Sequence, residues 1–134
     1  MSLASRLADL ITAIGADIKN INLKKNRDRV YTNATATGTV TLNLALYDIF
    51  ELTLTGNTTL AFSNAPTLSG EAIAPVVSIT CGATGYTTTW MSGISLWLTP
   101  GGTAPAGPAA GKTGEFIFTS KNGTTWTGRK GSAT

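Results

Sequence analysis

Alternation of apolar and polar residues over ELTLTGNTTLAF, residues 51–62, is the feature that most limits how this chain can fold. Alternate side chains of a strand point to opposite faces, so a period of two residues indicates a strand with one buried face. The apolar positions on both sides of the central Gly-Asn pair are Leu52, Leu54, Leu60 and Phe62. We expect these four side chains on the inner face of a sheet and the threonines on the outer face.

Two dipeptides in this chain are typical of two-residue hairpin turns. Gly56-Asn57 follows Thr55, and Asn122-Gly123 follows Lys121. Such pairs supply the positive φ that these turns require. The sequence therefore predicts a hairpin at each pair.

Short strand candidates fill the chain after residue 28, with no helical period among them. They are 29–33, 38–46, 49–55, 58–63, 72–81, 86–91, 94–98, 114–120 and 124–128. This spacing is typical of antiparallel all-β domains. We expect a mainly β fold with an antiparallel, jelly-roll-like β-sandwich. Residues 99–114, which hold three of the five prolines, are expected to form one long loop of the kind that often contacts a partner.

Composition supports this class and limits the chemistry. Charged residues are 13% of the chain, about half the usual share, and 24 threonines and 15 glycines take their place. Threonine is β-branched and favours strands. There is no histidine, which removes the commonest general base and metal ligand. Cys81 is the only cysteine, so no intrachain disulfide forms, and we expect it to be a small buried residue.

The first 23 residues predict a helix, with Ser2 as its N-cap. Its apolar residues recur every three or four positions and form one stripe: Leu3, Leu7, Leu10, Ile14, Ile18 and Ile21. A single helix cannot bury such a stripe alone, and isoleucine at successive core positions favours three or more helices over two. The helix packs either on its own β-domain or on copies of itself. We expect a trimeric coiled coil in an oligomerisation and anchoring segment, residues 1–25, and a β-sandwich domain, residues 26–134.

Basic residues gather after this helix, and from Val30 through Gly111 there is no lysine or arginine. We expect a basic segment that docks to an acidic partner, through Lys24, Lys25, Arg27 and Arg29. Nucleic-acid binding is disfavoured, because Tyr31 is the one aromatic residue near the cluster. No stretch approaches the roughly 20 apolar residues of a membrane span, and the N-terminus lacks the pattern of a secretory signal. We therefore expect no membrane insertion, and we expect that the chain does not use the secretory pathway.

Candidate catalytic features are weak. The segment AGPAAGKT, residues 106–113, is similar to a phosphate-binding loop, but a strand pattern follows it where that motif needs a helix. The carboxylates of the β region are Asp48, Glu51, Glu71 and Glu115. A glycosidase would need two of them at a fixed distance, but with only seven acids in the chain ordinary solubility explains them. We expect no catalytic residue, no metal ligand and no cofactor.

The three tryptophans allow two interpretations. Trp90, Trp97 and Trp126 form either a surface on which sugar rings stack or part of the core. Each lies in an alternating strand pattern, which favours the core.

Three segments together resemble a β-domain that recurs in structural proteins of tailed bacteriophages, often in tail fibres and other appendages. They are VTLNLALYDIFELTLTGNTTLAFSNAP, residues 40–66, ATGYTTTW, residues 83–90, and TGEFIFTSKNGTTWTG, residues 113–128, with a Trp and Pro-Gly-Gly between the last two. The resemblance covers roughly residues 38–128. The chain departs from the pattern at TWMSGISLWL, where a proline would follow Thr-Trp, and at TAPAGPAAGKTG.

This resemblance implies a non-enzymatic virion structural protein: a short fibre, a decoration protein or another appendage. Such proteins are typically homotrimers assembled in the host cytoplasm. The helical end would attach to a capsid, tail or baseplate protein. The alternative is a carbohydrate-binding or receptor-binding module that contacts host glycans through Trp90, Trp97 or Trp126 and the 99–114 loop.

Overall fold

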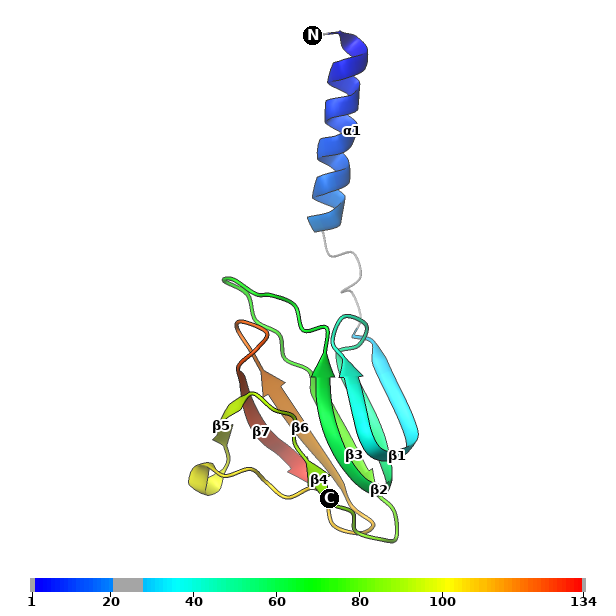
Figure 1. Ribbon diagram of the computed structural model, residues 1–134, viewed down its shortest axis with the longest axis vertical. Coiled ribbons are helices and arrows are strands. Elements are labelled where there is room, and N and C mark those ends of the chain that lie inside the picture. Colours follow the sequence, from blue (N-terminus) through cyan, green and yellow to red (C-terminus); the bar gives the residue numbers. More distant parts are fainter. Residues whose placement is uncertain (1, 21–27, 134) are drawn as a thin grey trace.

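The computed structural model describes residues 2–20 and 28–133, which form one N-terminal helix and a β-body (Figure 1). The helix, α1, spans Leu3–Asn20. The Ser5 N–H donates a hydrogen bond to Ser2 Oγ at 3.2 Å, which confirms Ser2 as the N-cap. The predicted end of the helix at residue 23 lies outside the described residues.

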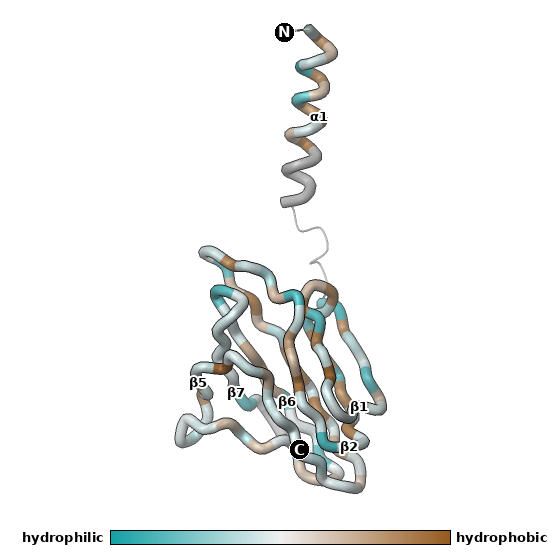
Figure 2. Tube along the Cα trace, in the orientation of Figure 1, coloured by the Kyte–Doolittle hydropathy of each residue, from teal (hydrophilic) through white to brown (hydrophobic). Residues whose placement is uncertain are grey.

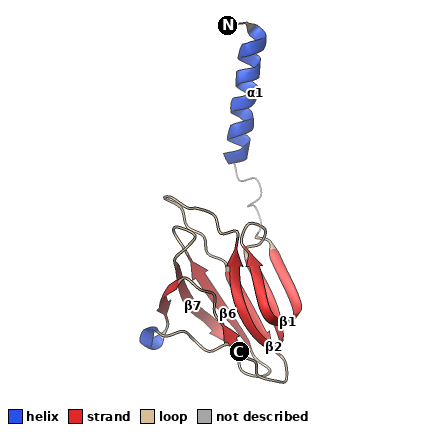
Figure 3. Ribbon diagram, in the orientation of Figure 1, coloured by secondary structure: helices blue, strands red, loops and turns tan. Residues whose placement is uncertain are grey.

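Seven strands form one mixed sheet in the β-body (Figure 3). They are β1 (Val30–Asn43), β2 (Ile49–Ser63), β3 (Val76–Cys81), β4 (Thr88–Thr89), β5 (Ile94–Leu98), β6 (Thr113–Thr119) and β7 (Trp126–Ala133). A short 3-10 helix, η1 (Pro100–Gly102), follows β5. The strand order is β1-β2-β3-β6-β7-β5, and β4 pairs with β2 outside this path. The predicted mainly β fold with an N-terminal helix is confirmed.

The sheet is mixed, whereas the sequence predicted antiparallel pairing throughout. β2 pairs in parallel with β1, β3 and β4, and β5 pairs in parallel with β7. Antiparallel pairing occurs between β3 and β6 and between β6 and β7. Alternation of apolar residues specifies which face of a strand is buried, and it does not specify the direction of the neighbouring strand.

Parallel pairing of consecutive strands follows from a bend in β1 and another in β2. The first arm of β1, Val30–Asn33, pairs with Ile49–Leu52, and the second arm, Gly38–Asn43, pairs with Thr58–Ser63. The register shifts between these two blocks, where both strands turn back on themselves (Figure 1). The first arm of β2 then pairs with β3 and its second arm with β4. The chain therefore bends in a similar way three times in succession and lays each bent segment beside the one before it, over residues 30–43, 49–63 and 76–89.

The predicted hairpin at Gly56-Asn57 is wrong. The two arms of β2 pair with the two arms of β1 and not with each other. Gly56 lacks the positive φ of a hairpin turn, and a Cβ there would overlap the Thr37 side chain of the neighbouring bend. The buried Thr58 Oγ1 donates to the carbonyl oxygens of Gly56, at 3.0 Å, and Ala36, at 3.4 Å, which ties the two bends together.

The hairpin at Asn122-Gly123 is present, with a connection longer than two residues. β6 ends at Thr119 and the antiparallel β7 begins at Trp126. Asn122 Oδ1 accepts hydrogen bonds from the N–H groups of Thr124 and Thr125, at 2.9 and 2.8 Å. Gly123 has a φ of 79°, in the region that favours glycine.

The core lies between the arms of the bent sheet, where hydrophobic residues alternate along the strands (Figure 2). Leu52, Leu54 and Leu60 are buried and Phe62 is partly buried, which confirms the predicted inner face of β2. Phe62, on the second arm of β2, packs against Trp126 of β7, with ring centroids 4.5 Å apart. The bend therefore places the second arm over β6 and β7.

Candidate functional site

The apolar stripe of α1 is the largest set of exposed hydrophobic side chains among the described residues. The exposed fraction of its side chains ranges from 48% at Ile14 to 81% at Leu3. The members described are Leu3, Leu7, Leu10 and Ile14. The side chains of the other two predicted members, Ile18 and Ile21, lie outside the described part of the chain.

Ile11 widens this stripe and was missed by the analysis of spacing. Its side chain is 62% exposed and lies next to Leu7 and Ile14 on the helix surface. Ile11 is four residues from Leu7 and three from Ile14, the same spacing as the other members, but it directly follows Leu10, which already occupies that turn of the stripe. The resulting apolar face is wider than the strict a/d seam of a coiled coil.

Within the described residues, α1 contacts no strand of the β-body (Figure 1). The stripe is therefore not buried by the sheet of its own chain. Of the two ways to bury it that the sequence left open, packing on the chain's own β-body is not observed for the described part of the helix. Among the described residues, no helix is both long enough and apolar enough to cross a membrane.

Of the four predicted basic docking residues, the structure describes one. Lys24, Lys25 and Arg27 lie outside the described residues. Arg29 is described, and its Nη2 donates a hydrogen bond to the Ala45 carbonyl oxygen at 3.4 Å. The backbone N–H of Arg29 donates to Asp48 Oδ2 at 3.3 Å, and the backbone carbonyl oxygen of Arg29 accepts from the Asp48 N–H at 2.9 Å. Arg29 thus holds the start of β1 against the turn between β1 and β2.

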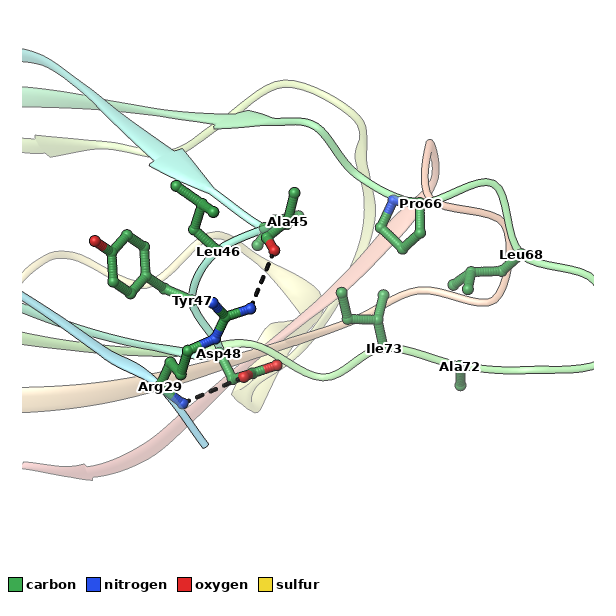
Figure 4. Close-up of a pocket in the computed structure, with 10 residues that line it drawn as sticks. Arg29, Ala45, Leu46, Tyr47, Asp48, Pro66, Leu68, Ala72 and Ile73 are labelled. Atoms are coloured by element: carbon green, nitrogen blue, oxygen red, sulfur yellow. Dashed lines mark hydrogen bonds between the residues drawn. The ribbon is translucent and has the colours of Figure 1, made fainter. Parts of the chain in front are cut away.

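A cavity of about 290 Å³ lies beside this arginine (Figure 4). Its walls come from three separate segments, through Leu44, Tyr47, Pro66, Leu68 and Ile73, and the charged residues Arg29 and Asp48 also line it. Sequence analysis missed this cavity because no local pattern links residues 29, 44–48 and 66–73.

The tryptophans belong to the core. Trp97 and Trp126 are buried, and Trp90 is partly buried with its Nε1 donating to the Pro105 carbonyl oxygen at 2.8 Å. The Trp90 ring packs on Phe116, with centroids 4.5 Å apart, and on Trp97, at 5.4 Å. The three rings therefore do not form an exposed surface for sugar stacking, and core packing is the interpretation that the structure supports.

The segment predicted as one loop, residues 99–114, contains η1 and ends inside β6, and it covers part of this core. Pro108 is buried, and Pro105 accepts the hydrogen bond from Trp90. The Gly111 N–H donates to the Gly82 carbonyl oxygen at 2.6 Å and the Lys112 N–H donates to the Ala109 carbonyl oxygen at 3.1 Å. These amides are engaged within the chain, and β6 follows them directly. The loop does not form the strand-loop-helix cradle that binds phosphate.

Two carboxylates that are far apart in sequence share a row across the sheet. Glu51 of β2 is paired with Ser78 of β3, and Ser78 is paired with Glu115 of β6. Adjacent strands are about 4.8 Å apart, so the two glutamates are separated by roughly 10 Å. Both side chains are exposed to solvent, and Thr32 Oγ1 donates to Glu51 Oε2 at 3.4 Å. No group of three or more potential metal ligands occurs in the part of the chain that is described.

The fold and the helix stripe define a β-rich module whose N-terminal helix has an exposed apolar face. Comparison of the whole chain with protein-family models, curated proteins and solved structures finds no significant match.

Proposed function

We propose that this protein is a non-enzymatic structural component of a bacteriophage virion and assembles as a homotrimer through α1. The observation that carries the proposal is the exposed apolar stripe of a helix that contacts no described strand of its own chain. The virion assignment rests on the resemblance of residues 38–128 to the β-domain of phage appendage proteins.

Association through α1 has a clear energetic reason. An isolated helix of 18 residues is marginally stable in water, because most helix stability in proteins comes from packing of an apolar face. Full burial of one leucine or isoleucine side chain contributes about 1.5–3 kcal/mol. Five such side chains, Leu3, Leu7, Leu10, Ile11 and Ile14, are exposed on each described helix. Packing of three copies removes most of this surface from water.

The architecture that we propose for the assembly is a short three-helix coiled coil joined to three sandwich-like β-bodies. The helical end attaches to a capsid, tail or baseplate protein. The outer face of β2 presents exposed threonines, including Thr53, Thr55 and Thr59, and a neutral β-branched surface suits close contact with neighbouring subunits. The mechanism is assembly and display, and no reaction step is assigned.

The glycan-binding alternative has less support. Trp97 and Trp126 are buried, and Trp90 and the 99–114 loop bind each other through the Trp90–Pro105 hydrogen bond. A glycan would have to bind elsewhere on the β-body.

Mass measurement of the purified chain tests the proposal. Light scattering at micromolar concentration is expected to give three times the chain mass of 13.8 kDa. Leu7→Glu places a charge in the stripe and is expected to give a monomer, because a buried unpaired carboxylate costs several kcal/mol. Thr12→Glu is the matched control, since Thr12 lies on the opposite side of the helix and is expected to leave the trimer intact.

A stable monomer of the unmodified chain at micromolar concentration would contradict the trimer. The virion assignment is tested separately, by mass spectrometry of purified particles. The chain is expected among their structural proteins, and its absence from particles of the phage that encodes it would contradict the assignment.

A further inference from the structure

We propose that the open edge of β1 is covered by a second copy of this chain, so that the subunit interface continues from α1 along the β-body. This inference rests on the trimer proposed above and names a second surface for it. The second surface is the backbone edge of β1, Val30–Asn43, which is separate from the apolar stripe of α1.

β1 is at one end of the strand order. β2 pairs with one side of it, and no strand of the described chain pairs with the other. With 14 residues, β1 is nearly three times as long as β5, the 5-residue strand at the opposite end of the order. α1 does not cover this edge, because it contacts no strand. A long row of backbone N–H and C=O groups is therefore left without a partner strand.

The two ends of the sheet differ in how they are protected from pairing with other chains. Proteins protect edge strands with charged side chains, prolines, bulges or short strand length. β5 is short, is followed by Pro100 and lies beside Arg129 of β7, the partner of Leu98. Residues 30–47 contain no charged residue and no proline. The one irregularity in β1 is the bend, and regular pairing with β2 continues on both sides of it.

The side chains of β1 also suit a further strand. On its second arm Val40 and Leu42 are buried while Thr39 and Thr41 are exposed. β2 has the same arrangement in register, with Thr59 beside Thr39 and Phe62 beside Leu42. A strand added at the open edge of β1 would therefore meet the same alternation of buried and exposed side chains that β1 meets at β2. A strand with one apolar face can extend the stack there.

A second copy is the occupant that the chain connectivity favours. β1 begins ten residues after α1 ends, at Val30 and Asn20. Ten extended residues span at most about 35 Å, so helices held in one bundle keep the first strands of the copies close together. Such tethering gives an effective concentration on the order of millimolar. At that effective concentration, even weak pairing of a second copy with the edge of β1 is sufficient to keep the edge covered.

Hydrogen exchange followed by mass spectrometry tests this inference on the full-length chain. In the unmodified protein we expect the peptide that covers residues 30–43 to exchange as slowly as the peptide that covers residues 49–63. In the monomer produced by Leu7→Glu, about half of the amides of 30–43 are expected to exchange at least tenfold faster, because alternate amides of an edge strand face solvent. The 49–63 peptide serves as the internal control for an intact β-body, and Thr12→Glu is the control for the helix.

The results separate this inference from the proposed function. Fast exchange of half of the 30–43 amides in a protein that light scattering shows to be trimeric would overturn the covered edge and leave the trimer standing. A monomeric unmodified chain would overturn both. Slow exchange of 30–43 in the trimer, lost selectively in the Leu7→Glu monomer, supports the covered edge.

Discussion

At the scale of single residues, two buried threonine hydroxyls have opposite surroundings. Thr58 Oγ1 donates to the carbonyl oxygens of Ala36 and Gly56 at the bends of β1 and β2. Thr88 Oγ1, on β4, is buried with no hydrogen-bond partner and lies against Gly107 of the long loop. Burying a hydroxyl costs free energy unless it is hydrogen-bonded. The same chemical change at the two positions should therefore have opposite effects.

Thr58→Val is expected to lower the free energy of unfolding by about 1 kcal/mol, because two carbonyl oxygens lose a donor. Thr88→Val keeps the shape and removes the unpaired hydroxyl, so it is expected to raise the free energy of unfolding by about 0.5–1 kcal/mol. Urea unfolding followed by tryptophan fluorescence measures both variants. Equal destabilisation by both would show that Thr88 has a partner in solution or that the two sites tolerate valine equally poorly.

At the scale of elements, α1 and the β-body derive their stability from different sources. The strands bury a continuous core within one chain. The described part of α1 buries its apolar side chains against nothing in the same chain. The helix should therefore depend on association, and the sheet should not.

Leu7→Glu is expected to remove most of the helical signal and to leave the sheet intact. Circular dichroism at 222 nm should lose the contribution of α1, because a separate helix of this length is marginal in water. The tryptophan fluorescence spectrum should not change, since Trp90, Trp97 and Trp126 belong to the core of the β-body. Retention of full helicity in a monomeric Leu7→Glu variant would mean that α1 is stabilised within its own chain.

At the scale of the whole molecule, the assembly that we propose would couple the helix and the β1 edge to the stability of the chain. Association that involves only the folded chain stabilises it by mass action, which makes the melting temperature depend on protein concentration. This coupling distinguishes a trimer that folds as one unit from β-bodies that are merely tethered.

The melting temperature of the unmodified chain is expected to rise by several degrees when its concentration increases a hundredfold. That of Leu7→Glu should stay constant over the same range, because its β-body unfolds as a monomer. Scanning calorimetry at several concentrations measures both. A melting temperature of the unmodified chain that is independent of concentration would contradict assembly-linked stability.

Much of the fold follows from local pattern. The helix and its Ser2 cap, the inner face of β2 and the burial of Cys81 were predicted from spacing and residue type, and all are confirmed. The hairpin at Gly56-Asn57 was not, because the local sequence that favours a hairpin also permits a bend. The neighbouring bend at Thr37 and Gly38 decides between them.

Sequence by itself determined the class of each segment in this protein, since a period of two or of three to four residues specifies which side chains share a face. It also predicted that the apolar stripe of α1 packs either on the chain's own β-domain or on copies of the helix. Only the tertiary structure decided that consecutive strands run parallel, that Glu51 and Glu115 share a row and that β1 is left at an open edge. The reason is that strand neighbours are chosen by contacts between distant residues, and periodicity within one strand carries no information about them.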